Sequence, residues 1–284
     1  MRLCFATRNR SKQPDMTTQT ALSRSAALYK RCQQIVAAAV AAFLLIATAR
    51  AETATSSPTP ALSRQQPQTV QSEVPHAVRM QYLLFLPVAY EKSTDRWPLI
   101  LYLHGGSVRG DDIAQMKRWG LAEKVEGEPD FPFIVVSPQC HTGEIWTDVE
   151  ALGAVLDDVA RSHRVDPDRV YVTGHSMGGR GALYAAYKMP DRFAAVLSLA
   201  PVFPITAWAA KLAGLPLWLF HGPNDQFTPL KEIEELFHAT EAAGGHPKLT
   251  VLPGRDHYIL DVYERPEIYE WLRHQRRNHP SVRK

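Results

Sequence analysis

A serine between two glycines, in the segment 174–178 (GHSMG), is the first place where this sequence could do chemistry. The hydroxyl of Ser176 is a weak nucleophile, so it must stand clear of the backbone on a strained turn that a base can reach. The flanking glycines permit a strand and a helix to cross closely there. The apolar run 170–172 predicts the strand, and the helix formers at 180–188 predict the helix. A chance match in a glycine-rich turn is the alternative, which these neighbours disfavour.

An activated serine needs a base, and the base needs an orienting acid. In the α/β-hydrolases, whose serine turn this segment resembles, the acid and then the histidine follow the serine in the chain, each on a loop after a strand. Asp225 comes just after the apolar run 216–220, and His257 comes just after the run 248–252. We therefore expect Ser176, Asp225 and His257 to form a catalytic triad. The alternative to a catalytic role is that Asp225 is an ordinary turn aspartate and His257 an ordinary histidine of a surface loop.

Other acidic and histidine side chains also follow the serine and could compete with this pair for the same roles. Asp256 adjoins His257 in the sequence and would generally point elsewhere. His238 falls within a predicted helix and His246 at a turn, so solvated or packing roles suit both. His221 ends a predicted strand, where it is expected to support the acid loop.

A tetrahedral intermediate carries an oxyanion, which two N–H donors must already face. The backbone N–H of Met177, next after the serine, is the first expected donor. The second should come from the loop after the strand 98–103, where paired glycines permit close backbone approach. Gly106 is preferred and Ser107 is second. The alternative is a glycine turn that merely ends a buried strand.

Apolar runs and helical periodicity alternate along the rest of the chain. Strands are predicted at 80–87, 98–103, 133–136, 170–172, 193–199, 216–220 and 248–252, and helices at 114–125, 149–163, 180–188, 230–243 and 266–277, with a turn at 166–168. Strands separated by helices predict an α/β fold with a mostly parallel sheet covered on both faces. The segment 202–215 is the only obvious insertion between predicted elements that could form a cap over the site.

The first 75 residues do not read as part of this fold. Basic residues precede the apolar run 35–48, and Ala49-Arg50-Ala51 has the form that signal peptidase accepts. We therefore expect a signal peptide at 1–51, a disordered linker rich in Thr, Ser, Pro and Gln at 52–75, and the catalytic domain at 76–284. An uncleaved anchor is the alternative, although the run is shorter than a bilayer-spanning helix. Met16 could also be the start. The expected location is secreted or periplasmic, without stable membrane insertion after cleavage.

Composition excludes several functions. The chain has 32 basic and 29 acidic residues, too even a balance to predict a nucleic-acid partner. Cys140 is the one cysteine after the predicted signal, so we expect neither an internal disulfide nor a thiolate catalyst. Asp111 and Asp112 could suggest a cation site, but paired aspartates at a helix start are more often caps. No metal and no cofactor are expected.

Several blocks in order carry a resemblance to a known family. They are His104-Gly105-Gly106, Arg109-Gly110-Asp111-Asp112, Ser137-Pro138-Gln139-Cys140 with Trp146, Gly174-His175-Ser176-Met177-Gly178-Gly179 and Phe220-His221-Gly222-Pro223-Asn224-Asp225. Together they resemble the secreted "predicted peptidase" group of α/β-hydrolases, which is similar to polyhydroxybutyrate depolymerase, feruloyl esterase and dienelactone hydrolase-like esterases. The resemblance implies the α/β-hydrolase fold, the same triad and oxyanion donors, and a substrate cleft lined by Trp146. A core position for Trp146 is the alternative.

These expectations combine into an exported serine hydrolase that cleaves carboxylic esters, of small molecules or linked to polysaccharides. An ester has a better leaving group than an amide, and nothing in the sequence supplies a propeller or an extended lid. A peptidase of prolyl oligopeptidase type is the alternative enzyme. A non-catalytic envelope binding protein on the same fold is the alternative from another class. The oligomeric state is left open.

Overall fold

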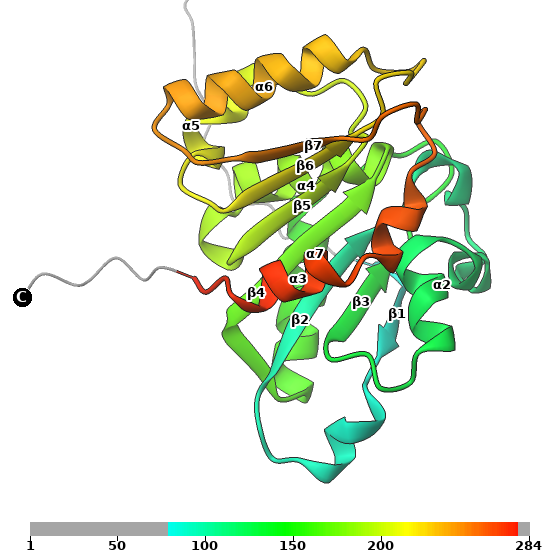
Figure 1. Ribbon diagram of the computed structural model, residues 1–284. Helices are drawn as coiled ribbons and strands as arrows, with labels where there is room; N and C mark the ends of the chain where they lie inside the picture. The colour runs from blue at the N-terminus through cyan, green and yellow to red at the C-terminus, as the bar shows by residue number, and fades with distance from the viewer. Residues whose placement is uncertain (1–78, 278–284) are drawn as a thin grey trace, which may run out of the picture. The chain divides into compact units, whose positions relative to one another are not determined.

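The computed structural model describes residues 79–277, and in this part of the chain seven strands form one sheet in the order β1-β3-β2-β4-β5-β6-β7 (Figure 1). The strands are β1 Tyr82–Phe85, β2 Trp97–Leu103, β3 Ile134–Pro138, β4 Val165–His175, β5 Ala195–Leu199, β6 Leu217–His221 and β7 Lys248–Val251. Only the pairing of β1 with β3 is antiparallel. The sheet is thus the mostly parallel one that the sequence predicts. The predicted signal peptide and linker lie outside the described residues.

Helices cover both faces of the sheet, as Figure 1 shows. The α-helices are α2 Gly120–Gly127, α3 Val149–Ser162, α4 Met177–Lys188, α5 Ala209–Leu212, α6 Leu230–Ala242 and α7 Pro266–Arg273. The 3₁₀ helices are η1 Val88–Lys92, η2 Gly106–Val108, η3 Ile113–Arg118, η4 Pro190–Arg192, η5 Thr206–Trp208 and η6 Leu260–Glu264. Successive strand residues face opposite ways, so Leu101 belongs to the core cluster that includes residues of α3, α4 and α6, while Ile100 belongs to the cluster that includes residues of α2 and α7. Strands buried on both faces explain the apolar runs without alternation.

The predicted helix at 114–125 is divided into η3 and α2. Gly120 lies at the division with a φ of 58°, a conformation that glycine adopts readily. A Cβ on Gly120 would lie 2.3 Å from the hydroxyl oxygen of Tyr102. The glycine therefore permits both the turn and the close approach of the buried tyrosine, and a single helix does not form.

The predicted turn at 166–168 lies inside β4 as a bulge. Trp97 pairs with Val165 and Leu99 pairs with Val170, so two steps along β2 correspond to five steps along β4. Within the bulge the amide of Asp168 donates to Oδ1 of Asp166 at 3.0 Å. The turn chemistry is therefore present, but the strand continues past it.

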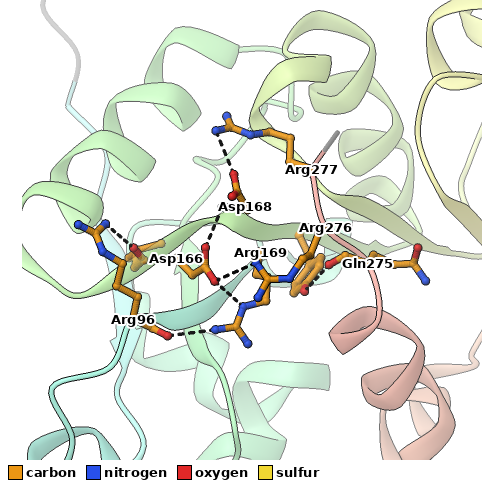
Figure 2. Close-up of polar contacts among 9 residues, drawn as sticks. Arg96, Asp166, Asp168, Arg169, Gln275, Arg276 and Arg277 are labelled. Atoms are coloured by element: carbon orange, nitrogen blue, oxygen red, sulfur yellow. Dashed lines mark hydrogen bonds and ion pairs between the residues drawn. The ribbon is translucent and has the colours of Figure 1, made fainter. Parts of the chain in front are cut away.

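The C-terminal helix is shorter than predicted, because the chain leaves α7 to bind this bulge (Figure 2). The hydroxyl of Tyr171 donates to the carbonyl of Gln275 at 3.0 Å, and the amide of Arg277 donates to the carbonyl of Asp168 at 2.9 Å. Arg276 lies 3.6 Å from the carboxylate of Asp166. Residues 274–277 thus form a strap along the N-terminal end of β4, in place of the last helical turn.

Candidate active site

Ser176 stands on the turn between β4 and α4 in a strained backbone conformation. Its φ is 59°, which is rare for a residue with a side chain. A Cβ on Gly174 would lie 2.3 Å from the carbonyl oxygen of Gly178, and a Cβ on Gly178 would lie 1.8 Å from that of Leu103. No side chain fits at either place. The two glycines are therefore required by the crossing of β4, α4 and the end of β2, as the motif predicts.

Backbone strain extends to the neighbouring loop after β5. Among the described residues, the non-glycine positions with positive φ are Ser176, Ala200 and Phe203. The amide of Ser176 donates to the carbonyl of Leu199 at 2.9 Å, and its own carbonyl accepts from Val202 at 3.4 Å. Strained residues gather where surrounding structure holds them, which is common at functional sites.

The structure brings together the three side chains expected to form a triad. Nε2 of His257 lies 2.8 Å from Oγ of Ser176, and Nδ1 of His257 lies 2.7 Å from Oδ2 of Asp225. Asp225 follows β6 and His257 follows β7, so neighbouring parallel strands deliver both to the same edge of the sheet. Both are nearly buried, at 7% and 4% exposed. This geometry suits an imidazole that donates from Nδ1 and accepts a proton at Nε2.

The carboxylate of Asp225 is held in its charged form. Its Oδ1 accepts the amides of Phe227 at 2.8 Å and Thr228 at 3.0 Å. Burial raises the pKa of Asp225, but the hydrogen bonds from His257 and these amides outweigh burial and place the pKa below its usual value. An ionised acid beside His257 is what an orienting role requires.

The competing side chains are not brought to the serine. The carboxylate of Asp256 accepts the amide of Tyr258 at 3.0 Å. His238 is exposed and contacts Glu241, and His246 is exposed at the turn before β7. Each position fits the solvated or local role considered for it.

The glycine loop after β2 lies against the serine turn. The Cβ position of Gly105 is 3.7 Å from Cβ of Ser176, and that of Gly106 is 4.0 Å from Sδ of Met177. Met177 begins α4 and Gly106 begins η2, and the first N–H groups of a helix lack partners within it. The geometry leaves both amides available to an oxyanion. Their role, and the choice of Gly106 over the exposed Ser107, stay predictions.

Three buried histidines around the triad were not predicted as a set. His104 donates from Nδ1 to the carbonyl of Gly105 at 2.8 Å, and His175 donates from Nε2 to that of His257 at 2.7 Å. His221 donates from Nε2 to Thr228 at 2.9 Å and lies 3.6 Å from the Asp225 carboxylate, as the expected support of the acid loop. Each loop of the site is thus tied by one histidine.

These three histidines are neutral. A carbonyl oxygen only accepts, so the bonded nitrogen carries the proton; in His104 the other nitrogen accepts the amide of Cys140 at 3.0 Å. Burial lowers the pKa of all three, that of His175 to about 4. A signal for two of them was visible, because His104 and His221 each end an apolar run directly before a glycine.

Trp146 lies in the core, at 3% exposed. The indole N–H of Trp146 donates to the carbonyl of His104 at 2.9 Å. A Cβ on Gly181 would lie 2.5 Å from Cβ of Trp146, so the glycine permits this close packing. The side chain therefore braces the glycine loop against α4. This placement matches the core alternative, and contact with substrate stays a prediction.

Of the paired aspartates, Asp112 takes the capping role, at the start of η3. Oδ1 of Asp112 accepts the amide of Ala114 at 3.1 Å, and Oδ1 of Asp111 lies 2.6 Å from Nδ1 of the partly exposed His141. Within residues 79–277, no group of three or more histidine, cysteine or acidic side chains is placed to hold a metal. No helix in that range is long and apolar enough to cross a membrane.

A mostly parallel sheet that carries a serine on a strained strand-to-helix turn, with an acid and a histidine after later strands, is the architecture of the α/β-hydrolases. Similarity to known proteins then places the chain in one family within this class. Residues 76–252 match the esterase family described as "Putative esterase", and the chain belongs to that family.

Several relatives share part of the chain. It is 30% identical over 169 residues to "Putative esterase NocK" of Nocardia uniformis subsp. tsuyamanensis, covering 53% of this chain and 46% of that protein. It is 28% identical to the "Bifunctional acetylxylan esterase/xylanase XynS20E" of Neocallimastix patriciarum, covering 48% of this chain and 20% of that protein. The chain thus spans less than half the length of either relative. A solved thermostable esterase shares the fold with a TM-score of 0.61 at 24% identity, over 70% of this chain and 59% of its own.

Proposed function

We propose that the protein hydrolyses carboxylic esters through a covalent acyl-enzyme on Ser176. The observation that carries the proposal is the continuous path of hydrogen bonds from Ser176 through His257 to Asp225, at 2.8 and 2.7 Å. Membership of the esterase family supports the same chemistry.

In the acylation step, Oγ of Ser176 attacks the ester carbon while Nε2 of His257 takes the hydroxyl proton. Asp225 orients the imidazole and stabilises its positive charge. The N–H groups of Met177 and Gly106 bind the oxyanion of the tetrahedral intermediate. When the intermediate collapses, the bond to the alcohol oxygen breaks, and the alcohol leaves with the proton from His257.

Deacylation repeats these steps with water. Nε2 of His257 takes a proton from a water molecule whose oxygen adds to the acyl carbon. The second intermediate releases Oγ of Ser176, which recovers its proton from the imidazole. A carboxylic acid leaves and the site returns to its starting state.

The substrates that fit this proposal are esters of small molecules or esters attached to polysaccharides. The similarity to a protein described as an acetylxylan esterase and xylanase supports a carbohydrate-linked ester. We also propose that the protein is exported, on the support of the apolar run 35–48 followed by Ala49-Arg50-Ala51. N-terminal sequencing of the exported protein would then begin at Glu52, whereas a retained N-terminus would indicate the uncleaved anchor.

The test is hydrolysis by the mature chain of p-nitrophenyl acetate, butyrate and octanoate, methyl ferulate and an aminoacyl p-nitroanilide. We expect ester turnover that Ser176→Ala abolishes, and labelling of the wild type alone by a fluorophosphonate. Anilide turnover without ester preference would replace the proposal with a peptidase. Equal labelling of wild type and variant, together with no turnover of any substrate, would favour the alternative of a non-catalytic binding protein.

A further inference from the structure

Two exposed aromatic rings flank the imidazole of His257. The ring of Phe227 is 50% exposed, with its centroid 4.6 Å from that of His257. The ring of Tyr258 is 58% exposed, with its centroid 5.6 Å away. Large aromatic side chains gain stability from burial, so two that stay in water beside one functional group point to a binding role.

Backbone hydrogen bonds anchor both residues. The amide of Phe227 donates to Oδ1 of Asp225 at 2.8 Å. The amide of Tyr258 donates to the side chain of Asp256 at 3.0 Å, and its carbonyl accepts from the guanidinium of Arg255 at 3.0 Å. The rings are therefore presented from fixed loops, and a ligand that stacks on them need not order the backbone first.

The chemistry of the site determines which part of a substrate meets these rings. In the proposed reaction, Nε2 of His257 protonates the leaving alcohol, so the alcohol oxygen must come within hydrogen-bond reach of that atom. The acyl oxygen lies instead toward Met177 and Gly106. Groups that flank the imidazole are thus placed to contact the alcohol side of the ester.

We propose that Phe227 and Tyr258 form a subsite for the leaving alcohol, and that this alcohol is a sugar ring; the inference rests on the proposed function. A sugar ring has an apolar C–H face that stacks on an aromatic ring and hydroxyl groups that stay hydrated. Half-exposed rings suit it, because they offer a stacking face without enclosing the ligand. The exposed polar side chains of Asn224 and Gln226, on the loop of Phe227, can bind the hydroxyls.

The test compares alcohols that share one acyl group: a mono-O-acetylated methyl xylopyranoside, phenyl acetate and ethyl acetate. The readout is kcat/KM for the sugar acetate divided by that for ethyl acetate. This ratio cancels any effect on the triad, because such an effect is common to both substrates. We expect Phe227→Ala and Tyr258→Ala each to lower the ratio by about 3- to 10-fold, the size of one aromatic contact.

Conservative variants and a matched ring control sharpen the test. Phe227→Tyr and Tyr258→Phe keep an aromatic ring and should restore the ratio. Trp119→Ala removes a ring that is 41% exposed and outside the described ring contacts of His257, and should leave the ratio unchanged.

Three outcomes would overturn the subsite. An unchanged ratio in both alanine variants, with Ser176→Ala inactive on every acetate, would reject the subsite and leave the esterase in place. A larger loss on phenyl acetate than on the sugar acetate would make the occupant an aryl alcohol. Turnover of no ester above the Ser176→Ala level would remove the proposed function and the subsite together.

Discussion

The two ends of the sheet are held together by different forces. At the site end, His104, His175 and His221 are buried, neutral and bonded to backbone carbonyls of the loops that they support. At the opposite end, arginines and aspartates of the β4 bulge and the C-terminal strap form ion pairs (Figure 2). The side chain of Arg276, for example, is 61% exposed.

This contrast distinguishes the contacts that position the site loops from those that attach the C-terminal strap to the sheet. A buried hydrogen bond is costly to break because its partner is left unsatisfied, whereas exposed ion pairs are screened by water and contribute little. The loops that carry the proposed reacting groups are held by buried hydrogen bonds of the first kind. The strap, which needs only to stay attached, adds partly exposed ion pairs of Arg276 and Arg277 to its hydrogen bonds with β4.

The largest expected effect lies in the triad. Asp225→Asn should lower kcat for ester hydrolysis by about four orders of magnitude with little change in Tm, because the imidazole loses its orienting anion and its correct tautomer. Asp256→Asn, one residue from His257, is the matched control and should reduce kcat less than about threefold. Steady-state kinetics with p-nitrophenyl acetate checks both, and comparable losses in the two variants would contradict the assignment of the acid.

A steric change at the site end comes next. In Gly178→Ala the new Cβ would lie 1.8 Å from the carbonyl oxygen of Leu103, so β2, β4 and α4 would have to separate. We expect the free energy of unfolding in urea to fall by at least about 3 kcal/mol, or the protein not to fold. Gly153→Ala in α3 meets only Sδ of Met189 at 3.5 Å and should be neutral or stabilising by up to about 1 kcal/mol. Similar losses of unfolding free energy in the two variants would show that steric crowding by the new Cβ of Gly178→Ala is not the cause.

Acid should weaken the fold through the buried histidines. The pKa of His175 is about 4 in the fold, lowered by burial and by the nearby His257 but raised by Asp225 and the bond to the His257 carbonyl. An unfolded histidine takes its proton near pH 6.5, so the unfolded state binds more protons between pH 6.5 and 4, and stability falls as pH falls through that window.

The variant His175→Gln measures how much of this pH-dependent loss of stability comes from His175 alone. Stability of the wild type should drop between pH 6.5 and 4 by on the order of 3 kcal/mol more than that of the variant. Urea unfolding at several pH values measures the difference. Parallel curves for the two proteins would mean that His175 titrates normally.

The smallest effect belongs to the strap. Arg276→Gln removes a 3.6 Å ion pair with Asp166 and should lower the free energy of unfolding by less than about 1 kcal/mol, with kcat unchanged. Arg169→Gln should cost more, because Nε of Arg169 lies 2.6 Å from the same carboxylate and is less exposed. A loss above about 2 kcal/mol for Arg276→Gln would remove the contrast between the two ends.

Local patterns predicted most of the fold. Buried strands appear as apolar runs, and the glycines around Ser176 announce a close crossing that a Cβ would block. The order of Asp225 and His257 after strands placed both on the correct edge of the sheet. These features could be predicted because each depends on residues near one another in the chain or on the general order of parallel strands.

Partners of buried polar groups were harder to predict. The indole of Trp146 bonds a carbonyl 42 positions away, and His175 bonds one 82 positions away. No periodicity encodes such contacts, because they depend on how separate strands align. The division at Gly120 and the early end of α7 had the same cause: tertiary contacts with Tyr102 and with the β4 bulge decided the local conformation.

The position of β7 has a consequence for how activity is lost. This strand is the last in the sheet, pairs on one side only with β6, and carries the loop of His257. Edge strands fray at lower free energies than the centre of a sheet, through openings that leave the rest of the molecule folded. We therefore expect heating or mild denaturant to abolish the proposed activity by displacing His257, while Ser176, at the end of the central strand β4, stays in place. Activity would then report local opening before any global unfolding is visible.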